Sequence, residues 1–116
     1  MPEVKTYVFF VYAPDYTDPD AFNRRLSVRS QHLERMGGLG KKGILRMGGA
    51  LASPESIESD QKKLVGSGMM FEAESADAVR KILEEDIYWT SSVWDKEKIV
   101  ILPFLSAGPL PSMVAE

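Results

Sequence analysis

Two side chains in this sequence combine a reactive group with a position that suggests proton transfer, and the first is a histidine. His32 is the only histidine, and it lies beside the apolar stripe of a predicted helix, with Arg29 three residues before it and Met36 four residues after it. An imidazole at the edge between core and solvent keeps a pKa near neutrality and can act as a general acid or base. A histidine that only packs or lies on the surface would fit the same position, so His32 needs a partner before it indicates a site.

The second candidate is a carboxylate at an inward-facing position. Asp86 continues the stripe of another predicted helix, seven residues after Val79 and three after Leu83, so it is expected to face the core. It is also expected at the C-terminal end of that helix, where the dipole disfavours a negative charge and a cationic or hydrogen-bonding partner must offset the cost. Alternatively, Asp86 belongs to a solvated acidic helix end together with Glu84 and Glu85.

Together these two residues predict a proton shuttle. In it, Asp86 accepts a hydrogen bond from one ring nitrogen of His32, fixes its tautomer and raises its basicity, while the other nitrogen meets the substrate. Such a pair can support enolisation, isomerisation or elimination of a small polar aromatic or carbonyl compound.

Substrate contacts are expected from the histidine side of the helix and from aromatic residues. Arg29 and Arg25 can hold an anionic substrate there, although exposed helix arginines are usually solvated. Gly49, within a predicted strand, allows close approach by another group. Four aromatic residues can line a pocket or else pack in the core: Tyr12, Tyr88, Trp89 and Trp94.

Composition argues against several other functions. A net charge of −3, with the 14 Lys and Arg spread along the chain, opposes nucleic acid binding. Without cysteine and with one histidine, the chain has neither a disulfide nor a His/Cys zinc cluster, and a carboxylate-only magnesium or calcium site, although open, has no loop signature. No serine has the context of an activated nucleophile, and neither glycine group matches a phosphate-binding motif. No metal and no cofactor are therefore expected.

The same patterns predict a cytoplasmic protein that does not act at membranes. The N-terminus lacks the features of a signal peptide, and no apolar run approaches the roughly 18 residues of a membrane span.

Hydrophobic patterning predicts the elements that position these residues. Strands are expected at 4–13, 44–51, 65–73 and 93–104, and helices at 19–41 and 75–86, with a loop at 53–63. Asp18 and Ser75 are the expected N-caps, and Pro19 the first position of its helix. The apolar stripe of the first helix comprises Phe22, Leu26, Leu33, Met36 and Leu39.

This order is β-α-β-β-α-β, which indicates an α+β, ferredoxin-like fold in which helices cover one face of an antiparallel sheet. A single domain over residues 1–105 with a mobile C-terminal tail over 106–116 suits the chain length. The strands carry apolar residues at both parities, as in Phe9-Phe10, Met69-Met70 and Val100-Ile101, so the second face is also expected to be buried. Its simplest cover is the same sheet of another copy, which predicts a homodimer.

Several short motifs, in order and spacing, resemble the YCII-related (YciI-like) family. They are Tyr12-Ala13-Pro14-Asp15, Arg24-Arg25-Leu26-Ser27-Val28-Arg29-Ser30-Gln31-His32-Leu33, Gly43-Ile44-Leu45, Gly48-Gly49-Ala50, Gly66-Ser67, Phe71-Glu72-Ala73-Glu74-Ser75, and Asp86 with Val93-Trp94 and Pro103-Phe104. The resemblance covers nearly all of residues 4–105. It implies a ferredoxin-like dimeric α/β-barrel whose pocket contains a histidine and an aspartate proposed to be catalytic, corresponding to His32 and Asp86.

Two positions depart from the family pattern. Ser30 replaces the proline that usually precedes the histidine, and Ile87 replaces the proline that usually follows the aspartate, which removes a fixed helix stop.

The function expected from the residues and the resemblance is that of a small cofactor-independent enzyme. It would use a His-Asp pair for isomerisation, elimination of the lyase type or dehalogenation of a small polar aromatic or carbonyl metabolite. Two alternatives stay open on the same fold, a module that binds a small molecule or a partner without catalysis, and a cofactor-free monooxygenase.

Overall fold

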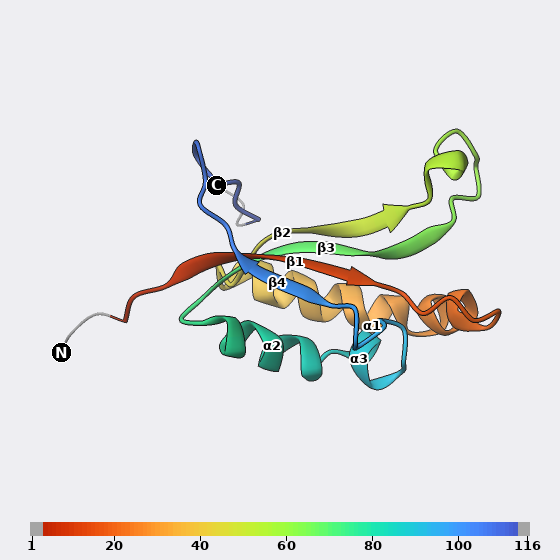
Figure 1. The fold of residues 1–116 in the computed structure, drawn as a ribbon, viewed down its shortest axis with the longest axis horizontal. Helices are drawn as coiled ribbons and strands as arrows, with labels where there is room; N and C mark the ends of the chain where they lie inside the picture. The colour runs from red at the N-terminus through yellow and green to blue at the C-terminus, as the bar shows by residue number, and fades with distance from the viewer. Residues whose placement is uncertain (1–3, 114–116) are drawn as a thin grey trace.

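The computed structural model describes residues 4–113 as one antiparallel sheet with helices packed against one of its faces (Figure 1). The predicted order β-α-β-β-α-β and the α+β, ferredoxin-like fold are confirmed. The elements are β1 (Tyr7–Pro14), α1 (Ala21–Lys41), β2 (Leu45–Ala52), the 3₁₀ turn η1 (Pro54–Ser56), β3 (Leu64–Ala73), α2 (Ala76–Glu84), α3 (Ile87–Thr90) and β4 (Val100–Pro103).

The strands lie in the order β2-β3-β1-β4, and each neighbouring pair is antiparallel. Val11 of β1 is paired with Met69 of β3 on one side and with Ile101 of β4 on the other, and Met69 is paired with Gly48 of β2. Paired residues in an antiparallel sheet point to the same face. This row therefore crosses the whole sheet on the side of the helices, where the core lies.

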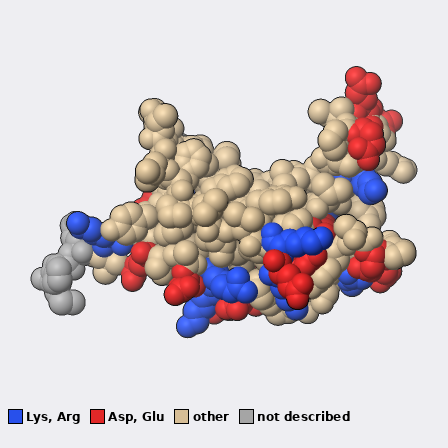
Figure 2. Space-filling model, viewed as in Figure 1, with Lys and Arg blue, Asp and Glu red and all other residues tan. Residues whose placement is uncertain are grey.

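Within residues 4–113, the opposite face of the sheet is mainly apolar, and much of it is exposed. Along β1, Val11 is completely buried, whereas Phe10 and Tyr12 on either side of it are 39% and 41% exposed. Figure 2 shows that charged side chains gather over the helices and at the tip of the β2–β3 connection and leave the surface over the strands largely free of charge. The large apolar residues exposed in the strands on this outer face are Phe10, Tyr12, Met47, Leu51, Val100 and Leu102.

The buried face of α1 differs from the predicted apolar stripe. Phe22, Leu26 and Leu33 are 39%, 50% and 48% exposed, so for these residues the prediction was wrong. The face against the sheet instead carries two polar side chains, and its buried residues are Ala21, Arg25, His32, Met36 and Gly40.

The start of α1 also differs from its prediction. The helix begins at Ala21 with Asp20 as its N-cap, two residues later than expected. Asp18 is not the N-cap, and its carboxylate instead accepts two hydrogen bonds from Arg24, at 2.7 and 2.8 Å. Ser75 does cap α2 as predicted, since its hydroxyl accepts from the Ala78 amide at 3.1 Å.

The last strand is shorter than predicted. β4 contains only Val100–Pro103, because a turn closed by the hydrogen bond from the Lys98 amide to the Asp95 carbonyl interrupts the segment. Trp94 before that turn forms only an isolated bridge with Asp15. Pro103 lies on an edge strand, where a missing amide proton is tolerated.

The end of the described C-terminal tail contacts the body of the protein, whereas Leu105 at its start is 93% exposed. Arg46 donates to the carbonyl of Pro111 at 3.1 Å, and the side chain of Met113 packs on Gly40 at the end of α1. Residues 114–116 of the tail, and residues 1–3 of the N-terminus considered for a signal peptide, lie outside the described residues. Within 4–113, no helix is both long enough and apolar enough to cross a membrane.

Candidate active site

His32 lies on the buried face of α1, four residues before Met36 and seven after Arg25. Its side chain is 8% exposed, so it is buried rather than placed at the boundary with solvent. Its Nδ1 lies 2.8 Å from Oδ1 of Asp86, a residue 54 positions further along the chain. The contact predicted between these two side chains is therefore present.

Asp86 occupies a break between two helices, not the end of one. α2 ends at Glu84, and Asp86 has an extended backbone and is the N-cap of α3, with Oδ1 accepting the Tyr88 amide at 2.8 Å. The prediction that a C-terminal helix dipole opposes its charge was wrong, because the amide of a following helix stabilises it instead. Ile87 starts α3 without the proline of the family pattern, and the helix stop is retained.

A third group completes the shell of Asp86. Arg35 of α1 donates from Nη1 to Oδ2 at 2.9 Å, so both oxygens of a carboxylate with no exposed area have partners. Arginine and a backbone amide can only donate, which makes Asp86 the acceptor and assigns the proton of its contact with His32 to Nδ1. The sequence analysis missed Arg35, although its spacing of three residues from His32 places both on neighbouring faces of the helix.

Aromatic rings fix the plane of the imidazole. The ring of Tyr88 stacks on that of His32 with centroids 3.8 Å apart and an angle of 10° between the planes. Trp94 meets both rings edge-on, with centroids 5.7 Å from His32 and 5.6 Å from Tyr88. Burial raises the pKa of the Tyr88 hydroxyl, and the nearby positive charges of Arg25 and Arg29 partly oppose this rise.

A second buried network lies beside the first. Arg25 donates from Nη1 to both oxygens of Asp15, at 2.8 and 2.9 Å, and from Nη2 to the hydroxyl of Ser67 at 3.3 Å. The indole of Trp94 donates to the same hydroxyl at 3.1 Å. Burial raises the pKa of the Asp15 carboxyl, while Arg25 lowers it again in part. This network links the sheet to α1 next to His32.

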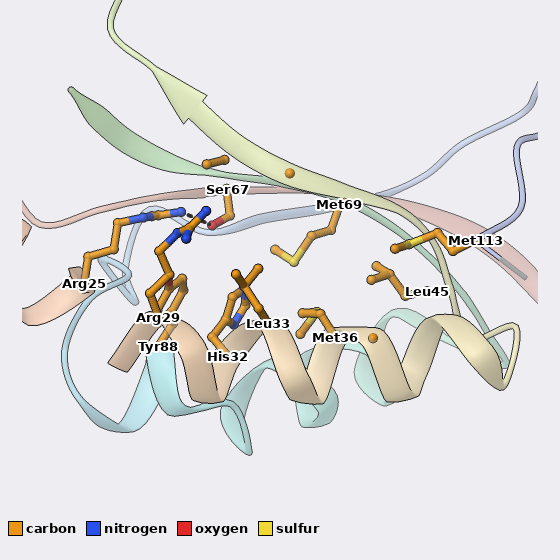
Figure 3. Close-up of a pocket in the computed structure, with 14 residues that line it drawn as sticks. Arg25, Arg29, His32, Leu33, Met36, Leu45, Ser67, Met69, Tyr88 and Met113 are labelled. Atoms are coloured by element: carbon orange, nitrogen blue, oxygen red, sulfur yellow. Dashed lines mark hydrogen bonds between the residues drawn. The ribbon is translucent and has the colours of Figure 1, made fainter. Parts of the chain in front are cut away.

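A cavity of about 270 Å³ opens between α1 and the sheet, and His32 forms part of its wall (Figure 3). An apolar cavity of about 150 Å³ is known to hold benzene, so this one has room for a single substituted ring. Within the described residues 4–113, no aspartate or glutamate lines it. The side chains that border it, mainly apolar residues and two arginines, include Arg25, Arg29, His32, Leu33, Met36, Leu45, Ser67, Met69, Tyr88 and Met113.

The residues predicted for the site have different places in the structure. His32, Arg29, Gly49 and Tyr88 border the cavity. Asp86 lies behind His32 and does not border it.

The two remaining predicted contacts, Trp94 and Tyr12, lie elsewhere. Trp94 is fully buried behind the wall, where it orients the rings and binds Ser67. Tyr12 was placed wrongly, because Ala13 and Val11 point to the helices and the alternation along β1 turns Tyr12 to the outer face.

A four-stranded ferredoxin-like sheet with a histidine and a carboxylate joined beside a pocket defines a class of small α+β proteins. The YCII-related domain model matches residues 7–104, and the chain belongs to that family. Fusaric acid biosynthesis protein 2 from Gibberella fujikuroi is 31% identical over 104 residues, 90% of this chain and 96% of that protein. Protein YciI from Escherichia coli O6:H1 is 30% identical over 97 residues, 84% of this chain and 95% of that protein.

The fold also resembles a solved structure, 5-chloro-2-hydroxyhydroquinone dehydrochlorinase (TftG) from Burkholderia phenoliruptrix AC1100, in complex with 2,5-dihydroxybenzoquinone. The TM-score is 0.70 at 22% identity, and the match covers 84% of this chain and 93% of that one. At this identity, the likeness concerns the fold alone.

Proposed function

We propose that this protein is an enzyme that transfers a proton to or from a small ring or carbonyl compound, with His32 as general acid and base and Asp86 as its partner. The observation that carries the proposal is that one imidazole both binds a buried carboxylate through Nδ1 and borders a cavity. The reaction would be an isomerisation, an elimination or a dehalogenation, and the proposal requires no cofactor.

The arrangement suits a base that must become a cation during the reaction. With Nδ1 donating to Asp86, Nε2 keeps its lone pair for a substrate proton, and the carboxylate stabilises the imidazolium that forms. Arg35 and the Tyr88 amide hold the carboxylate in place, and the stacked ring of Tyr88 holds the imidazole. Proton transfer by a positioned side chain contributes about 10²–10⁴-fold to a rate.

The fold neighbour supports the elimination reading. That protein is a dehydrochlorinase, solved in complex with a dihydroxybenzoquinone. The loss of hydrogen chloride from a ring compound is an elimination that a general base can start. A chlorinated or otherwise substituted hydroxyhydroquinone is therefore a reasonable first substrate for the present chain.

We further propose that the protein works as a homodimer in which the outer faces of two sheets pack together. The outer face carries exposed aromatic and aliphatic residues and little charge, as Figure 2 shows for the surface over the strands. A contiguous apolar surface of this kind is typical of an interface between subunits. A second copy of the same face would be complementary in polarity, and light scattering measures the resulting mass.

Solvent exchange and product release test the catalytic proposal. The protein is incubated in D₂O with a panel of cyclic ketones and hydroxyquinones that includes a chlorinated hydroxyhydroquinone, and deuterium uptake and chloride release are followed. We expect His32→Ala and Asp86→Asn to abolish both, while Gln31→Ala, at an exposed neighbouring position of α1, retains them.

Several outcomes would contradict the proposal. Full activity of either site variant would exclude the pair as the proton-transfer group, and ligand binding without turnover over long incubation would indicate a binding module. Activity that disappears under anaerobic conditions would indicate a monooxygenase.

A further inference from the structure

The side chains around the cavity have more hydrogen-bond donors than the protein has acceptors for them. Within residues 4–113, Nε of Arg25 and the hydroxyl of Tyr88 are buried and have no hydrogen-bond partner. More than 90% of buried polar groups in proteins have one. Both residues border the cavity, and because neither atom has exposed surface, a ligand that supplies the missing acceptors must displace part of the cavity wall to reach them.

Ser67 contributes a third donor by a different argument. Its hydroxyl oxygen accepts from the indole of Trp94 and from the guanidinium of Arg25, and both of these groups can only donate. The hydroxyl proton of Ser67 therefore has no acceptor in the described part of the chain. Figure 3 shows this side chain extending from the sheet into the space above α1, where it binds the end of Arg25.

Arg29 is the fourth donor and carries the charge. It borders the cavity at an exposed position of α1, and in residues 4–113 it forms neither an ion pair nor a hydrogen bond. The charge of Arg25, by contrast, is balanced by Asp15. Among residues 4–113, no acidic residue borders the cavity, so the described part of its wall is positive although the whole chain has a net charge of −3.

The acceptors near the cavity are already occupied. Both oxygens of Asp15 bind Arg25, and both oxygens of Asp86 bind His32, Tyr88 or Arg35. Among the described side chains, Nε2 of His32 and the hydroxyl oxygen of Tyr88 are left as acceptors, and the imidazole nitrogen is the one that suits a base.

We infer that the substrate is a small anion with its charge on oxygen, of the ring carboxylate, phenolate or hydroxyquinone class. Arg29 would attract it, the hydroxyls of Ser67 and Tyr88 and Nε of Arg25 would donate to its oxygens, and its apolar part would lie against Met36, Leu45 and Met69. This inference deepens the proposed function by naming its substrate class, and it rests on that function for the presence of a reaction.

Equilibrium binding of three probes with one ring each tests this inference without turnover. Isothermal titration calorimetry compares benzoate and 2,5-dihydroxybenzoquinone, which are anions at neutral pH, with benzylamine, a cation of the same size as benzoate. We expect the anions to bind and benzylamine not to bind. Binding of the anions should weaken as salt is added, because Arg29 is exposed.

Two variants assign the contacts. Tyr88→Phe should weaken binding of the anions by about 10-fold or more, the usual effect of losing a hydrogen bond to a charged group. It should leave the melting temperature unchanged or raise it, because the hydroxyl has no partner to lose. Arg29→Gln should weaken binding by a similar factor and reduce its salt dependence, whereas Arg80→Gln, on α2 away from the cavity, should bind as the native protein does.

Three results would overturn the inference. They are equal affinity for benzylamine and benzoate, no binding of either anion at millimolar concentration, and native affinity in both Tyr88→Phe and Arg29→Gln. These outcomes are separate from the proposed proton transfer. Binding of anions that depends on Tyr88 without any deuterium exchange would leave the ligand class standing and refute the reaction. Deuterium exchange that depends on His32, together with native affinity for the anions in Tyr88→Phe and Arg29→Gln, would support the reaction and refute the ligand class.

Discussion

Replacing Asp86 by asparagine separates the structural role of this residue from its proposed role in the reaction. The native carboxylate accepts through Oδ1 from His32 and the Tyr88 amide, and through Oδ2 from Arg35, at 2.8, 2.8 and 2.9 Å. An asparagine has one oxygen and one amide group. If its oxygen stays towards His32 and Tyr88, its amide faces Arg35, and two donors oppose each other.

The stability cost of this substitution can be worked out from these contacts. The side chain of Arg35 is 28% exposed and can move into solvent, so its loss costs about 1 kcal/mol. The other two hydrogen bonds lose the charge of their acceptor, which lowers each by about 1 kcal/mol. We therefore expect Asp86→Asn to reduce the free energy of unfolding by about 2–3 kcal/mol, measured by urea denaturation, with the fold retained.

The effect on the rate should be larger. Asparagine leaves the imidazolium without a counter-charge, so the rate of proton exchange should fall by about 10²–10⁴-fold, the whole contribution of a general base. Arg35→Met is the matched comparison, because it removes the same partner of Oδ2 and leaves the charge of Asp86 beside His32. It should lower the rate much less than Asp86→Asn, although it also lowers stability because it leaves Oδ2 of the buried carboxylate without a donor. Equal rates for the two variants would refute the view that the carboxylate acts electrostatically on His32.

Three further predictions concern stability and assembly. Arg24 holds the pKa of the exposed Asp18 carboxyl at about 2, below its ordinary value of 3.8. The ionised carboxylate therefore stabilises the folded chain fully above pH 3.8, and this stabilisation is lost as the pH falls through 2. Asp18→Asn should lower the melting temperature at pH 7 and leave it unchanged near pH 2. Trp94→Phe removes one hydrogen bond to Ser67 and leaves space in a fully buried site, so it should cost about 2–3 kcal/mol in urea denaturation. A loss above about 5 kcal/mol would mean that the indole supports more than this contact and its own packing. Leu102→Glu places a charge on the outer face of the sheet and should shift light scattering to the monomer mass, whereas Leu105→Glu, beyond β4 and 93% exposed, should not.

The sequence predicted the sheet better than the helices, for a physical reason. β-strands of a buried sheet carry dense runs of apolar residues, such as Val8 to Val11 and Met69 to Phe71, which few other structures explain. The element order β-α-β-β-α-β followed from such runs, and the inward direction of Asp86 followed from its helical spacing to Val79 and Leu83. The helix break at Glu85 could not be predicted in this way. It depends on the carboxylate of Asp86, which accepts a hydrogen bond from the Tyr88 amide two residues later, and such a contact leaves no periodic pattern in the sequence.

The cavity itself was the least predictable feature. Ser67 has no sequence context that marks it, and its role arises from the meeting of β3 with a side chain of α1 and the indole of Trp94. Tyr12 looked equally suitable as a pocket residue, but one position of register along β1 decides which face it occupies.

The buried face of α1, which the sequence analysis predicted wrongly, is also the face that carries the proposed chemistry. A helix normally turns its apolar stripe to the sheet, and here Leu26 and Leu33 are about half exposed while Arg25 and His32 are buried. Burying a cation and an imidazole is unfavourable unless each has an ionic or hydrogen-bonding partner, and two aspartates from separate segments, Asp15 and Asp86, provide those partners. Stability alone would favour apolar residues at positions 25 and 32, since well-packed hydrophobic side chains often replace buried ion pairs without loss. Helix α1 nevertheless buries Arg25 and His32, and both border the same cavity. The ligand that the cavity binds, and the proton transfer proposed for His32, best explain why these polar side chains are kept there.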